Sequence, residues 1–184
     1  MNRVKTGVDG LDEVLNGGFP EESITLVSGL PGSGKSILGY QFINQGIQQG
    51  ERCLLITLDR KENKVIAQAE KFNFPFRKAV EEGKLKVLYM DVNKRYIYET
   101  IIKEILKGGY DRVVIDSITP LTEAPFYLRD MSLNENINFI DPEDFSVMKE
   151  DIPLKRLHLR YIMDALESIG CTAIVTAEAP LGST

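Results

Sequence analysis

The chain has 184 residues, of which 43% are hydrophobic and 27% are charged, a composition typical of a globular protein rather than a disordered or fibrous one. The formal net charge of −5 excludes a general electrostatic attraction to nucleic acid or to anionic membranes. Because this length is near that of one ordinary domain, we predict a single domain over residues 1–184.

Short runs of apolar, often β-branched residues alternate along the chain with longer amphipathic stretches. Five runs are predicted strands, at residues 23–28, 52–58, 84–90, 112–117 and 171–178. Three stretches place apolar residues at helical spacing, at residues 37–47, 97–105 and 154–169. Strands that are apolar at successive positions and are joined by helices indicate a parallel sheet covered on both faces. The predicted fold class is therefore α/β.

Residues 123–151 break this alternation. They show no sustained periodicity and contain eight acidic residues against Arg129 and Lys149. Long irregular segments in compact domains are usually functional or mobile, so we interpret this segment as an acidic loop or lid, with a plain solvated excursion as the alternative. Its negative charge would repel a phosphodiester backbone, and we expect nucleic acid not to be a partner.

The segment GLPGSGKS, residues 29–36, has the spacing of a phosphate-binding P-loop (the Walker A motif) between a predicted strand and a predicted helix. Its glycines let backbone N–H groups turn toward phosphate oxygens at the positive end of the helix. We predict that Lys35 contacts the β- and γ-phosphates and that the Ser36 hydroxyl coordinates Mg²⁺. The predicted nucleotide-binding residues are Gly29, Pro31, Gly32, Ser33, Gly34, Lys35, Ser36 and Ile37.

A second motif, RVVID, ends at Asp116 after an apolar run. A magnesium-bound nucleotide requires a carboxylate at the end of a nearby parallel strand, where it holds the metal and its water shell. We therefore predict that Asp116 is a metal-binding residue together with Ser36. The alternative is an aspartate that ends a strand and caps the following turn.

More specific stretches are TGVDGLDEVLNGGFPEESITLVSGLPGSGKS, GERCLLITLDRKENKV, EEGKLKVLYMD, VVIDS and GCTAIVTAE. Together they resemble the KaiC-like branch of the RecA-type ATPases, from about Thr6 to Glu178. The resemblance implies a RecA-like fold, ATP and Mg²⁺ as ligands, and a homo-oligomer, which in the family is typically a hexamer. It also implies that strand 171–178 lies between the P-loop strand and the strand of Asp116. Thr176 and the predicted catalytic residue Glu178 would then lie near the γ-phosphate, with a solvent-facing polar strand end as the alternative.

The family pattern ends its second strand with two adjacent glutamates, the first of which activates the attacking water. Here Asp59 and Arg60 occupy these positions. We predict that Asp59 is catalytic together with Lys35. Its side chain is one methylene shorter than that of a glutamate, about 1.5 Å of reach. Arg60 can pair with Asp59 and lower its basicity. We expect an ATP-binding module with slow hydrolysis whose nucleotide state controls assembly or partner binding. The alternatives are a conventional ATPase motor and a DNA-binding recombinase relative.

In the family, further strands follow the sensor strand, and a basic residue on them reaches the nucleotide of the neighbouring subunit. No Lys or Arg follows Arg160 here, so we expect these strands to be missing, in a protein that is either naturally short or a fragment. An arginine finger contributes about 10³- to 10⁵-fold to phosphoryl transfer, and its loss would also favour slow turnover.

Other residues carry weaker signals. We predict that Cys53 and Cys171 are buried, since neither has a second cysteine nearby, and that His158 packs on its helix. Lys155, Arg156 and Arg160 form a small basic cluster, either a solvated face or a contact for an anionic partner. Since the sequence has neither a membrane-span-length apolar run nor a secretory segment, we expect a cytoplasmic protein without membrane contact.

Overall fold

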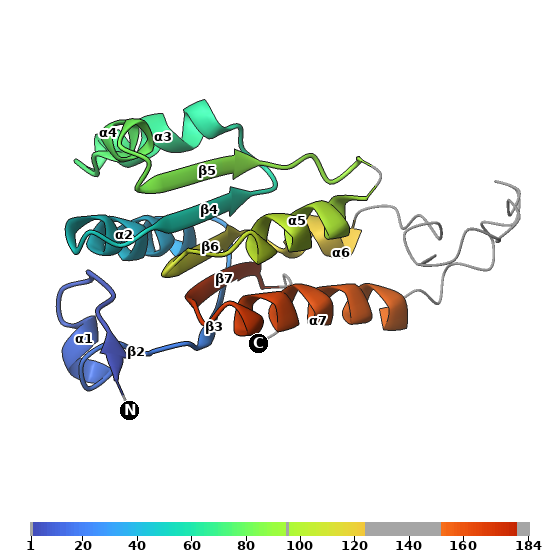
Figure 1. Cartoon of the computed structure of the whole chain (residues 1–184), viewed down its shortest axis with the longest axis horizontal. Coiled ribbons are helices and arrows are strands. Elements are labelled where there is room, and N and C mark those ends of the chain that lie inside the picture. The colour runs from blue at the N-terminus through green and yellow to red at the C-terminus, as the bar shows by residue number, and fades with distance from the viewer. Residues whose placement is uncertain (1, 95, 124–151, 180–184) are drawn as a thin grey trace, which may run out of the picture.

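The computed structural model describes residues 2–94, 96–123 and 152–179, which form a five-stranded parallel sheet with helices on both faces (Figure 1). The predicted α/β class is confirmed. All five predicted strands are present, with ends within one residue of the prediction. In chain order they are β3 (Ile24–Gly29), β4 (Cys53–Thr57), β5 (Leu85–Tyr89), β6 (Arg112–Asp116) and β7 (Thr172–Glu178).

Each central strand is apolar at successive positions because helices cover both faces of the sheet. In β4, Leu54 and Ile56 pack in one core cluster, whereas Cys53 and Leu55 pack in the other. The first cluster includes residues of α5 (Ile97–Leu106), α6 (Thr119–Glu123) and α7 (Ile152–Ser168). The second includes residues of α2 (Lys35–Gln48), α3 (Glu62–Lys71) and α4 (Phe76–Glu81). The three predicted helices correspond to α2, α5 and α7.

The strand order is β3-β7-β6-β4-β5, so β7 lies between the P-loop strand and the strand that ends at Asp116. This is the position of β7 that the resemblance implies. The register pairs Gly29 with Glu178 and Ile115 with Val175. Because all these strands are parallel, their carboxyl ends meet at one edge of the sheet, where ligands bind in open α/β folds. Among the described strands β3 is at the border of the sheet, and its Leu26 is 62% exposed.

The amino-terminal segment packs against the edge of the sheet where the amino ends of the strands meet. It contains a two-stranded antiparallel sheet and a one-turn helix, which are β1 (Arg3–Val4), α1 (Leu11–Val14) and β2 (Phe19–Pro20). Arg112, the first residue of β6, is 1% exposed and joins this segment to the sheet. Its Nη1 donates to the carbonyl oxygens of Lys5 (2.7 Å) and Phe42 (3.0 Å), and its Nε pairs with Glu51. Arg112 therefore has a structural role, since every partner is a group of the fold itself.

The weaker sequence predictions agree with the structure where they fall on described residues. Cys53 and Cys171 are buried, as predicted, and burial raises the pKa of both thiols to about 12. His158 packs on α7 with its ring centroid 4.8 Å from that of Tyr98, also as predicted. Arg156 and Arg160 are exposed. The predicted loop or lid lies outside the described residues from 124 onward. Among the described helices, none is both long and apolar enough to cross a membrane.

Candidate functional site

The P-loop connects β3 to α2. After β3 ends at Gly29, the chain turns through residues 30–34 and α2 begins at Lys35. Gly32 and Gly34 have φ values of 78° and 91°, in the left-handed region that side chains with a Cβ rarely adopt. Because the turn ends at the start of a 14-residue helix, the positive end of the helix dipole lies beside the loop.

The ammonium group of Lys35 lies within the loop. Its Nζ donates hydrogen bonds to the carbonyl oxygens of Gly29 (2.8 Å) and Leu30 (2.9 Å). Phosphate oxygens are stronger acceptors than neutral carbonyls because they carry charge. The loop therefore holds the lysine where an entering phosphate can accept its hydrogen bonds.

Asp116 lies at the end of β6 and is 6% exposed. The hydroxyl of Thr176, on the neighbouring β7, donates a 2.6 Å hydrogen bond to its Oδ1. Within the described part of the chain, no hydrogen bond reaches the other carboxylate oxygen. Thr176 is itself fully buried, so its hydroxyl is used to orient Asp116.

Asp59 and Arg60 follow the end of β4. The hydroxyl of Thr57 donates to Oδ1 of Asp59 (3.3 Å) and accepts from the backbone N–H of Arg60 (3.2 Å). The Arg60 Nε lies 3.8 Å from Oδ2 of Asp59, and its Nη1 donates to Oε1 of Gln68 on α3 (2.6 Å). The ion pair that the sequence suggested is present, but it is long and both side chains are more than 40% exposed, so its energy is small.

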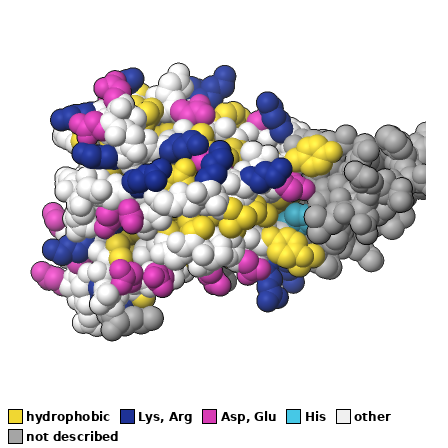
Figure 2. Space-filling model, in the orientation of Figure 1, with side chains coloured by type: hydrophobic (Ala, Val, Ile, Leu, Met, Phe, Trp, Pro, Cys, Tyr) yellow, Lys and Arg dark blue, Asp and Glu magenta, His cyan; other side chains and the backbone are white. Residues whose placement is uncertain are grey.

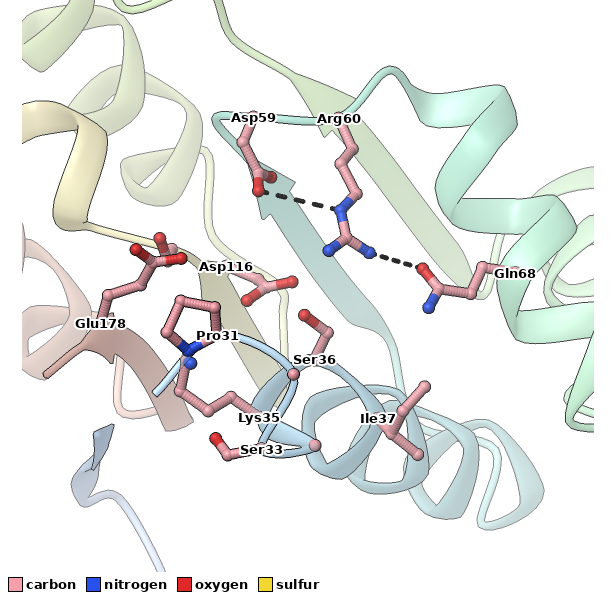
Figure 3. Close-up of a pocket in the computed structure, with 13 residues that line it drawn as sticks. Pro31, Ser33, Lys35, Ser36, Ile37, Asp59, Arg60, Gln68, Asp116 and Glu178 are labelled. Carbon is pink, nitrogen blue, oxygen red and sulfur yellow. Dashed lines mark hydrogen bonds and ion pairs between the residues drawn. The ribbon is translucent and has the colours of Figure 1, made fainter. Parts of the chain in front are cut away.

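These elements surround a cavity of about 230 Å³ at the carboxyl edge of the sheet (Figure 3). The cavity is below the roughly 300–1,000 Å³ of common ligand pockets, a size suited to the phosphate portion of a nucleotide. All predicted nucleotide-binding, metal-binding and catalytic residues except Gly29 line it, and Gly29 contributes the carbonyl that holds Lys35. Thr176, which was predicted near the γ-phosphate, does not line it and instead donates to Asp116. The lining residues are Pro31, Gly32, Ser33, Gly34, Lys35, Ser36, Ile37, Asp59, Arg60, Gln68, Asp116, Ser117 and Glu178.

The KaiC family of ATPases matches residues 4–135. The chain belongs to this family. It is 32% identical to a UPF0273 protein of Saccharolobus solfataricus over 99% of the chain and 62% of that relative. It is 30% identical to a UPF0273 protein of Pyrococcus furiosus over 99% of the chain and 70% of that relative. The chain thus spans about two thirds of the length of these relatives.

A solved structure gives the same result for the fold. The crystal structure of a KaiC-like protein from Pyrococcus horikoshii superposes with a TM-score of 0.72 at 28% sequence identity, and the match covers 97% of this chain and 71% of that one. The RecA-type, KaiC-like fold expected from the sequence is confirmed. Membership of the KaiC ATPase family implies nucleotide binding.

The donor set in this KaiC-family site fits a magnesium ion. Ser36 and Asp116 offer a hydroxyl and a carboxylate, and both line the same cavity. Among the described residues no group of three or more His, Cys, Asp or Glu could hold a metal by itself. Mg²⁺ usually takes one or two protein ligands and completes its shell with phosphate oxygens and water. Oxygen donors from two residues are therefore sufficient here.

Two residues of this site were not predicted. Gln68 and Ser117 both line the cavity. The only sequence signal for Gln68 is its position on a helix that follows the end of a strand, and this signal is weak. Nothing in the spacing of Ser117 marks it.

Proposed function

We propose that the chain binds ATP with Mg²⁺, hydrolyses it slowly, and uses its nucleotide state to control assembly or partner binding. The observation that carries the proposal is that Lys35, Ser36 and Asp116, which come from two elements far apart in sequence, line one cavity. Lys35 supplies a positive charge for the β- and γ-phosphates, and Ser36 with Asp116 holds the metal. The bound metal supplies charge neutralisation at the phosphates.

Slow hydrolysis follows from the residue that faces the attacking water. We assign this role to Asp59, with Glu178 on the opposite wall as a second candidate in catalysis. Asp59 is 46% exposed and reaches one methylene less than a glutamate. General-base assistance is worth about 10²- to 10⁴-fold. A typical enzyme turns over about ten times per second, and a loss of about 10²-fold, the lower end of this range, would leave about 0.1 per second.

Control of assembly is the least direct part of the proposal. It draws on the family resemblance, which implies a homo-oligomer. The proposed location of the protein is the cytoplasm. Nucleic acid is not proposed as a partner. On the face shown in Figure 2, acidic and basic side chains of the described residues are interspersed, whereas nucleic-acid-binding proteins usually gather Lys and Arg on one face.

The proposal is tested with ATP-binding calorimetry and a steady-state phosphate-release assay on one preparation, with its mass in solution measured with ATP and with ADP. Lys35→Ala should abolish measurable ATP binding, while Lys78→Ala, at an exposed ion pair with Glu82 on α4, should leave it unchanged. Unchanged ATP affinity in Lys35→Ala would remove the site assignment. Turnover of several per second in the unmodified chain would instead favour a conventional ATPase motor.

A further inference from the structure

One corner of the cavity contains a second positive charge. Of the lining residues, Lys35 and Arg60 are cationic, and Asp59, Asp116 and Glu178 are anionic. In Figure 3, Lys35 and Arg60 lie on different sides of Ser36. A phosphate group bound beside Ser36 would therefore meet a cation on each side.

The guanidinium group of Arg60 is only partly used by the protein. Its Nη1 bonds to Gln68, and its Nε makes the 3.8 Å contact with Asp59. The side chain is 41% exposed. Arginine presents five N–H donors in a planar fork that matches phosphate oxygens, and it stays charged at all physiological pH values. Arg60 thus has more N–H donors than these two contacts use, and it lines a phosphate-sized cavity.

Tyr40, a buried residue of α2, is influenced by the charges of Arg60, Asp59 and Asp116. Tyr40 is 1% exposed. Burial raises the pKa of Tyr40 to about 12; the negative charges of Asp116 and Asp59 add to this rise, and the positive charge of Arg60 opposes it.

We propose that Arg60 binds the terminal phosphate of ATP within its own chain and so distinguishes ATP from ADP. The inference rests on the proposed ATP binding. When the terminal phosphate is present, the guanidinium exchanges its long contact with Asp59 for a charge-assisted, bidentate one. Through the bond to Gln68, this movement changes the environment of α3. Since such a contact exists before and during cleavage alike, it tightens binding without accelerating hydrolysis.

The test compares ATP and ADP affinities, each with Mg²⁺, in the unmodified chain and in Arg60→Gln. We expect Arg60→Gln to weaken ATP binding about ten- to a hundredfold, the loss of a hydrogen bond between charged groups, and to change ADP binding by less than about twofold. Arg60→Lys keeps the charge but not the planar fork of donors. Its ATP affinity should lie between those of the unmodified chain and Arg60→Gln. The matched control is Arg77→Gln, which breaks an exposed ion pair with Glu70 outside the cavity and should change neither affinity.

Hydrogen exchange gives a second measurement. Residues 62–71, which form α3, should change their protection with ATP but not with ADP, and Arg60→Gln should remove the difference. Equal losses of ATP and ADP affinity, or no loss of either, would overturn the inference while leaving the proposed function intact. If the unmodified chain binds neither nucleotide, the proposed function fails and this inference fails with it.

Discussion

The hydrogen bond from Thr176 to Asp116 can be tested by Thr176→Val, which removes the hydroxyl and keeps the shape of the side chain. The bond is 2.6 Å long, Thr176 is fully buried and Asp116 nearly so, which means that water cannot replace the lost donor. A hydrogen bond to a charged group contributes about 1.5–3 kcal/mol, so we expect the free energy of unfolding to fall by about 2 kcal/mol.

The measurement is urea-induced unfolding without nucleotide, followed by circular dichroism. Thr176→Ser is the matched control, because it keeps the donor and loses only one methyl group, worth about 0.8 kcal/mol. Saturating Mg²⁺ and ATP should reduce the deficit of the valine variant, since the metal would neutralise the carboxylate that lost its donor. If the valine variant is as stable as the unmodified chain, Thr176 does not orient Asp116 and the account of this end of the sheet is wrong.

Two further predictions concern the reaction itself. Asp116→Asn keeps an oxygen that can accept the hydrogen bond from the Thr176 hydroxyl but removes the charge. Magnesium-dependent ATP binding should therefore weaken, while metal-free binding stays nearly unchanged. Equal losses of both would indicate a purely structural aspartate. Asp59→Glu restores about 1.5 Å of reach and should raise phosphate release several-fold at unchanged ATP affinity, with Asp59→Asn as the control that lowers it. A slower Asp59→Glu variant would contradict the reasoning about the short carboxylate.

The strands could be predicted from the sequence to within one residue because a buried parallel strand must be apolar at successive positions. The order of the strands could not, since periodicity carries no information about neighbours, and the place of β7 came from the resemblance alone. The short elements β1, β2 and α1 were missed because two to four residues are too few to show a period. Helix α3 was missed because its buried face contains only Val65 and Ala69.

The phosphate loop could be predicted because one local segment contains the whole motif. The partners of Asp116 and Arg60 could not, because they come from other elements. Thr176 contacts Asp116 only because of the register between β6 and β7. Gln68 contacts Arg60 only because of the position that α3 takes in the fold. Contacts of this kind depend on tertiary packing, which no spacing along the chain records.

Strand β6 has opposite charges at its two ends, and they are expected to tolerate mutation differently. Arg112 contacts only the fold, and truncation of one partner of a buried ion pair costs about 3–5 kcal/mol. Asp116, four residues later, faces the cavity. In a mutational scan that scores abundance and activity separately, variants at position 112 should lower the amount of folded protein in the cell. Variants at position 116 that keep an oxygen should accumulate normally and lose activity.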